Sequence, residues 1–159
     1  MNTYKQLITT TFTALVGVAA ITIITFGSVA TAASGWSTNI DSALKLGKQK
    51  KKPVMVEFTG LDWCPPCQRM QKDVFSKKEF TQAASKKFIL VLIDIPKPGS
   101  SSAKKYHDLM RKYRVSGVPT ILLFGEDGRE FSRFTASEFP SVEGFLAKLD
   151  EELEKKGMD

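Results

Sequence analysis

Short apolar stretches alternate with amphipathic stretches along most of this chain. The stretches Val54–Phe58 and Phe88–Ile93 are nearly uninterrupted, which is typical of strands in a sheet that is covered on both faces. Two further strands, Thr120–Phe124 and Glu130–Phe134, flank an Asp127-Gly128 turn signal. The pattern therefore predicts that these two strands pair as an antiparallel hairpin.

Apolar residues at helical spacing predict helices around these strands. The first helix is predicted to begin at a capping box formed by Thr38 and Asp41 and to end near Gln49. Further helices are predicted over residues 65–74, 76–84, 101–113 and 140–156. This order predicts an α/β fold in which a central mixed sheet has a parallel βαβ part, a C-terminal β-hairpin and a closing helix.

The first 32 residues have the pattern of an export signal. Lys5 precedes an apolar stretch that is densest over residues 14–21, and small residues follow it. Ala30-Thr31-Ala32 has the small-x-small form that a signal peptidase accepts. We therefore expect residues 1–32 to be a Sec-type signal peptide that is cleaved after Ala32.

An N-terminal membrane anchor is the alternative interpretation of this segment. The apolar region from Leu7 to Phe26 approaches the ~20 residues that are needed to cross a bilayer. Either interpretation places the folded part outside the cytoplasm, in the periplasm of a two-membrane bacterium. The length of residues 33–159 suits one folded domain.

The composition is that of a globular protein with a modest positive charge. Hydrophobic residues make up 42% of the chain and charged residues 25%, and the formal net charge is +6. Lysines and arginines are scattered along the predicted helices and loops, which indicates solvated faces. Nucleic-acid binding would require a concentrated basic stripe and a docking motif, and the sequence shows neither. We expect a monomer that does not bind nucleic acid.

Cys64 and Cys67 are the only cysteines, so any sulfur chemistry uses this pair. The loop between them is too short for a structural disulfide to gain much stability. The pair lies between a predicted strand and a predicted helix N-terminus, where amides and the helix dipole favour a thiolate on Cys64. Pro65 and Pro66 remove two of those amides, and no cation lies between the cysteines. These features favour a more reducing couple.

Two motifs resemble the signatures of the thioredoxin superfamily. The segment Phe58–Cys67, with Trp63 before the first cysteine, resembles its active-site segment. Residues 117–120, Gly-Val-Pro-Thr, resemble its second signature, a loop whose proline is in the cis form. The continuation to Val74 and Phe75 is similar to periplasmic thioredoxin-like proteins, including DsbH-type disulfide reductases. The likeness covers about Trp36 to Leu153 and implies a thioredoxin-like fold for residues 33–159.

This resemblance implies roles for individual residues. Cys64 would be the attacking cysteine and Cys67 the resolving one, which together form the redox disulfide. Val118 and Pro119 would lie opposite the pair and hold a substrate strand. Trp63 would shield the sulfur atoms on the substrate-binding side, and the alternative for this residue is a simple packing role.

Glu57 falls near the position of a buried acid in thioredoxins that accepts a proton from the second cysteine. The fit is imperfect, because this chain has glutamate instead of aspartate and one extra residue before Trp63. A carboxylate in an apolar strand would have a raised pKa, which suits a proton acceptor. The alternative is a solvated Glu57 that faces the edge of the sheet.

The sequence thus predicts an exported thiol-disulfide oxidoreductase, specifically a protein disulfide reductase without a cofactor or metal. Its expected partners are disulfide-containing exported proteins as substrates and a membrane electron donor that re-reduces the pair. Two alternatives remain open. The same residues could serve a disulfide oxidase or isomerase, or the chain could be a thioredoxin-like module that binds copper through both thiolates and His107.

Overall fold

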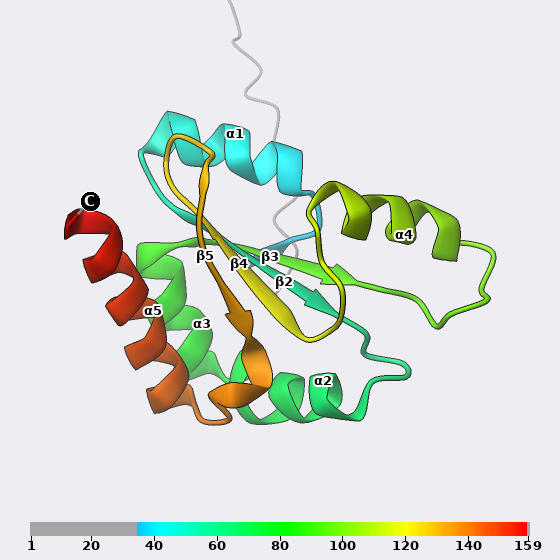
Figure 1. The fold of residues 1–159 in the computed structure, drawn as a ribbon. Coiled ribbons are helices and arrows are strands. Elements are labelled where there is room, and N and C mark those ends of the chain that lie inside the picture. The colour runs from blue at the N-terminus through cyan, green and yellow to red at the C-terminus, as the bar shows by residue number, and fades with distance from the viewer. Residues whose placement is uncertain (1–34, 159) are drawn as a thin grey trace, which may run out of the picture.

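The computed structural model describes residues 35–158 (Figure 1). The predicted signal peptide or anchor, residues 1–32, lies outside the described residues. Over residues 35–158, no helix combines the length and the apolar character that a membrane crossing requires.

A five-stranded mixed sheet forms the centre of the described part (Figure 1). The parallel strands are β1 (Trp36–Ser37), β2 (Val54–Thr59) and β3 (Ile89–Asp94), and the remaining two are β4 (Thr120–Phe124) and β5 (Glu130–Thr135). Their spatial order is β1-β3-β2-β4-β5, and β4 is antiparallel to both neighbours. The predicted parallel part and hairpin are confirmed. The sequence did not reveal β1, because two residues are too few for an alternating pattern.

Five helices occupy the positions that apolar spacing predicts. They are α1 (Ile40–Lys50), α2 (Pro65–Met70), α3 (Lys78–Lys87), α4 (Ala103–Lys112) and α5 (Val142–Met158). A π-helical segment, η1 (Gln71–Phe75), continues α2, and a 3-10 turn, η2 (Ala136–Glu138), follows β5. The predicted helix over residues 65–74 is therefore α-helical only in its first half.

The predicted capping box of α1 is wrong. The N-cap is Asn39, which has an extended backbone with φ −128° and accepts a hydrogen bond from the Ser42 amide at 2.8 Å. Asparagine caps a helix as well as serine or threonine does, so the cap moves one residue beyond Thr38. Asp41 then lies within the first turn, where its negative charge suits the helix dipole.

Helices cover both faces of the sheet in two layers (Figure 1). α1 and α4 pack against one face, where alternate residues of β2, Val54, Val56 and Phe58, enter the core. α2, α3 and α5 cover the other face, which receives Met55 and an aromatic cluster centred on Phe145. Because side chains alternate along a strand, Glu57 points to the same face as Met55, beneath α2.

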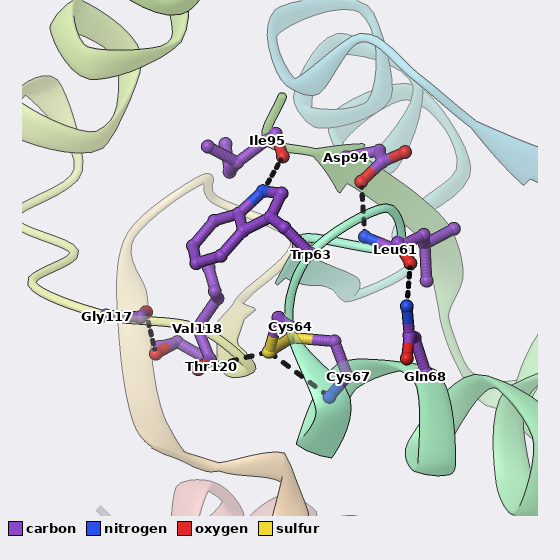
Figure 2. Close-up of a disulfide and its surroundings, with 10 residues drawn as sticks. All are labelled: Leu61, Trp63, Cys64, Cys67, Gln68, Asp94, Ile95, Gly117, Val118 and Thr120. Atoms are coloured by element: carbon purple, nitrogen blue, oxygen red, sulfur yellow. Dashed lines mark hydrogen bonds between the residues drawn. A yellow bond between two sulfur atoms is a disulfide. The ribbon is translucent and has the colours of Figure 1, made fainter. Parts of the chain in front are cut away.

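The site-bearing loops meet at one edge of the sheet. β2 and β3 are parallel, so the segments that follow both strands emerge together, and the segment before the antiparallel β4 starts at the same edge. This topology brings Trp63, Cys64, Ile95, Gly117 and Val118 into one neighbourhood (Figure 2).

Candidate active site

A disulfide joins Cys64 and Cys67 at the N-terminus of α2 (Figure 2). Pro65 and Pro66 occupy the first two helical positions, where a missing amide costs no intrahelical hydrogen bond. The Cys67 amide is therefore the first N–H that the helix offers, and it lies 3.3 Å from Cys64 Sγ. Cys64 is the N-cap, and its sulfur lies where a helix stabilises negative charge.

The two cysteines differ in their access to solvent. Cys64 keeps 5% of its surface exposed, whereas Cys67 is fully buried. The sequence predicts a reactive pair at an accessible helix tip. In the fold, only Cys64 of this pair keeps a small exposed surface. A reacting sulfur from outside can therefore approach Cys64 but not Cys67.

A cis peptide bond links Val118 and Pro119 in the loop before β4. The Val118 carbonyl oxygen lies 3.8 Å from Cys64 Sγ (Figure 2). The Thr120 hydroxyl donates to the Gly117 carbonyl at 2.7 Å and thereby closes this loop. None of the described residues accepts a hydrogen bond from the Val118 amide. The loop thus presents an unused backbone donor beside the disulfide.

Trp63 is fixed between the loops that follow β2 and β3. Its indole Nε1–H donates to the Ile95 carbonyl at 2.7 Å (Figure 2). A Cβ at Gly60 would lie 2.7 Å from the Trp63 ring, so the ring fills the space that glycine leaves. The Gly60 carbonyl also accepts the Cys64 amide at 2.8 Å. Trp63 is half-buried against the α1 and α4 core, and it is held in place next to Cys64.

Asp94 holds the turn that leads into the cysteines. Its carboxylate accepts the Leu61 amide at 2.8 Å, and the Leu61 carbonyl accepts the Gln68 side-chain amide at 2.7 Å (Figure 2). Both bonds tie residues 60–63 to elements that are fixed by the sheet and by α2. The position of Cys64 therefore depends on polar contacts as well as on packing.

Glu57 is fully buried in the central strand β2. Neither of its carboxylate oxygens has a hydrogen-bond partner within residues 35–158. Burial raises the pKa of Glu57 from its ordinary 4.5 to about 8. The nearby Thr59 hydroxyl group lowers this pKa, although it forms no hydrogen bond of normal geometry with the carboxylate. The negative charge of Asp94 raises the pKa further. The alternative of a solvated Glu57 at the sheet edge is wrong, because β2 has neighbours on both sides.

The structure does not bring His107 to the cysteines. His107 is exposed on α4, and within residues 35–158 no three histidine, cysteine or acidic side chains lie close enough to hold a metal ion. A copper site made of both cysteines and His107 is therefore wrong for the folded chain.

Comparisons with known proteins identify the family. A family model described as thioredoxin-like matches residues 35–125, which is more than half of the chain. The chain belongs to the thioredoxin-like family. This thioredoxin-like chain is 31% identical over 94 residues to disulfide bond reductase DsbH of Chlamydia pneumoniae, an alignment that covers 57% of each chain.

Two further relatives place this thioredoxin-like chain among known folds. It is 32% identical over 104 residues to the thiol:disulfide interchange protein DsbD of Klebsiella pneumoniae, covering 65% of this chain but 16% of that protein. A solved structure of a DsbH oxidoreductase superposes with a TM-score of 0.64 at 26% identity, over 75% of this chain and 83% of that one. The chain thus spans little more than half of the DsbH relative and a small part of DsbD. The predicted thioredoxin-like fold is confirmed.

The structure assigns positions to three residues that sequence reasoning passed over. Gly60 gives space to the Trp63 ring, Asp94 holds the Leu61 amide, and Ile95 accepts the indole N–H. A signal existed for Asp94, because an acid that ends an apolar parallel strand lies at the edge where α/β proteins place their sites. Ile95 acts through its backbone, so no side-chain pattern could have revealed it.

Proposed function

We propose that this chain is an exported thiol-disulfide oxidoreductase that reduces disulfides in other exported proteins. The observation that carries the proposal is the disulfide at the N-terminus of α2, in which Cys64 alone keeps exposed surface and its Sγ lies 3.8 Å from the Val118 carbonyl oxygen in the 117–119 loop. A substrate can reach Cys64 there and pair with the loop at the same time.

The reaction starts from the dithiol form. The Cys64 thiolate, favoured by the Cys67 amide and the helix dipole, attacks one sulfur of a substrate disulfide. A mixed disulfide forms, and the substrate's other sulfur leaves as a thiolate that takes up a proton. Cys64 is the attacking residue, because Cys67 has no exposed surface.

The second step releases the substrate. Cys67 loses its proton and attacks Cys64 Sγ, so the mixed disulfide breaks and the second substrate thiolate leaves. Two electrons pass from the cysteine pair to the substrate, and the chain ends in the disulfide form that the structure shows. One helical turn separates the two sulfurs, so the bond closes without a change of fold.

Glu57 is proposed as the proton acceptor for Cys67. It points to the sheet face that α2 covers, and its pKa of about 8 is close to the ~8.5 of an ordinary thiol. A proton can then pass between the two groups at little cost in either direction. The ionised carboxylate takes the proton when Cys67 attacks, and the protonated acid returns it when the disulfide is reopened.

Val118 and Pro119 are proposed to hold the substrate strand. An extended peptide that lies along residues 117–119 can accept a hydrogen bond from the Val118 amide. The Val118 carbonyl group lies 3.8 Å from Cys64 Sγ, so a strand paired there carries its own disulfide to the attacking sulfur. Trp63 borders this position and shields the sulfurs from solvent.

The reducing direction rests on the scarcity of donors around Cys64. Pro65 and Pro66 leave the Cys67 amide as the one N–H of the first helical turn, and no cationic side chain lies between the cysteines. A weakly stabilised thiolate makes the dithiol a better reductant. The DsbH relative is itself named a disulfide bond reductase, which supports the same direction. An oxidase or isomerase would use the same residues.

Re-reduction is assigned to a membrane electron donor outside the cytoplasm, in keeping with the predicted export signal. The folded domain, residues 33–159, acts as a monomer in the periplasm, and the chemistry needs no cofactor. Mass measurement of the N-terminus, on protein from the periplasmic fraction, is expected to give a start at Ala33. An intact Met1 would favour the anchor instead.

The decisive experiment measures the reduction of insulin disulfides by protein that has first been reduced with dithiothreitol. Cys64→Ser is expected to abolish activity, whereas Cys67→Ala is expected to accumulate mixed disulfides that a non-reducing gel resolves. The reduction potential of the pair is expected to be about −270 mV, the value of a reducing thioredoxin, and not the ~−120 mV of a strong oxidant. Activity that survives Cys64→Ser would refute the proposed enzymatic role of Cys64. A reduction potential near the oxidising value would refute the proposal that the protein works as a reductase.

A further inference from the structure

The two helical layers of this protein differ in charge. α1 and α4 carry seven lysine and arginine residues against two acidic residues, whereas α2, α3 and α5 carry seven against six. Loop residues beside α1 and α4 add more cations, so that ten exposed lysines and arginines lie within residues 45–51 and 97–114. We call this surface the cationic face. Both helices lie on one side of the sheet (Figure 1). The fold thus gathers charges that the sequence predicted to be scattered.

The acids of this layer are already neutralised within it. Asp41 pairs with Lys112 at 3.1 Å, and Asp108 pairs with Lys104 and Arg111. The first pair also joins α1 to α4, so the cationic face is continuous. Among residues 35–158, no acidic group forms an ion pair with the cations of residues 45–51. The excess positive charge therefore faces solvent without an internal partner.

The chemistry of this surface suits a diffuse anionic surface better than a protein interface. Every exposed side chain of α1 and α4 is polar or charged, and the apolar side chains of α4, such as Leu109 and Met110, pack against the sheet. A specific protein interface needs an apolar centre, which this face lacks. Eight of its ten cations are lysines, whose flexible point charges do not require the fixed geometry that arginine recognises.

We propose that the cationic face docks on the anionic phospholipid surface of a membrane. Each lysine near such a surface strengthens binding about fivefold, so several together hold the protein reversibly. The segment before α4 carries Ile95, whose carbonyl group holds Trp63 beside Cys64, and the segment after α4 carries Val118, whose carbonyl oxygen lies 3.8 Å from Cys64 Sγ (Figure 2). Docking would thus leave the disulfide at the rim of the bound face, open to a partner in the same membrane. This binding does not depend on the redox chemistry proposed above.

The test compares two variants of the oxidised full-length protein that have equal net charge. The face variant carries Lys45→Gln, Lys48→Gln, Lys50→Gln and Lys105→Gln. The control variant carries four substitutions on the other layer, namely Lys72→Gln, Lys77→Gln, Lys78→Gln and Lys86→Gln. All eight lysines are exposed, and none forms an ion pair within residues 35–158, so both variants are expected to keep the wild-type circular dichroism spectrum.

Co-sedimentation is measured with vesicles of phosphatidylcholine alone and with vesicles that also contain phosphatidylglycerol. The difference between the two isolates the electrostatic part from any apolar binding by the N-terminal segment. Wild type and control variant are expected to prefer the anionic vesicles, whereas the face variant binds them at least about a hundredfold more weakly. Raising the salt from about 0.1 M to about 1 M should abolish the preference, because the Debye length falls from about 10 Å to about 3 Å.

Three results would overturn the proposal. Equal binding of the wild type to both kinds of vesicle would refute membrane docking and would point to an acidic protein as the partner. Equal losses in both variants would show that net charge and not the cationic face controls binding. A preference that survives high salt would show that the interaction is not electrostatic.

Discussion

The buried carboxyl group of Glu57 makes the stability of the protein depend on pH in an unusual direction. Its pKa is raised by burial from 4.5 to about 8. Between pH 4.5 and about pH 8, Glu57 has released its proton in the unfolded chain but keeps it in the folded chain. The folded state then binds more protons, so the free energy of unfolding falls as pH rises, by about 1.4 kcal/mol per pH unit.

The size of the effect follows from the width of this window. The contribution is complete below pH 4.5, and it is lost progressively until the folded-state pKa of about 8 is passed. Over that range the loss amounts to about 5 kcal/mol, which is a large part of the 5–15 kcal/mol that a domain of this size ordinarily has. Glu57→Gln replaces the carboxyl group by a neutral group of similar shape, and this slope is expected to disappear.

Urea unfolding of the oxidised protein, followed by circular dichroism from pH 5 to pH 9, measures the slope directly. Glu79→Gln is the matched control, because it removes an exposed glutamate at the start of α3. The pKa of Glu152 is lowered to about 2, chiefly by its hydrogen bond from Lys148, and its contribution to stability is lost only on acidification below pH 4.5. Parallel profiles for wild type and Glu57→Gln would refute a buried, protonated Glu57.

Two core contacts give further predictions. Gly60→Ala would place a Cβ 2.7 Å from the Trp63 ring, so we expect a loss of about 1–3 kcal/mol in urea unfolding, together with a changed near-UV circular dichroism spectrum. An unchanged spectrum would show that the ring does not depend on this space. Phe145→Ala removes a fully buried ring that contacts Phe75 and Phe80, and a loss of about 3–5 kcal/mol is expected by the same assay. A loss below about 1 kcal/mol would contradict the central position of Phe145 in this core.

Much of the fold follows from local signals in the sequence. Three signals extend over a few residues each and can be recognised without the tertiary structure. They are the apolar runs of β2 and β3, the Asp-Gly turn between β4 and β5 and the apolar spacing of α5. The cysteine pair and its two prolines are local as well, because they form the first turn of one helix. The sequence alone therefore determined which sulfurs lie at the helix tip and which elements surround them.

The tertiary structure decided what depends on strand order and on contacts between distant segments. Glu57 is buried because β2 is the central strand and helices cover the face to which its side chain points, and the residues of β2 alone do not determine either feature. Val118 lies beside Cys64 across 54 residues of sequence. The cationic face exists because α1 and α4 pack on the same side of the sheet. Burial and charge density are properties of the packed chain, so only the assembled fold fixes them.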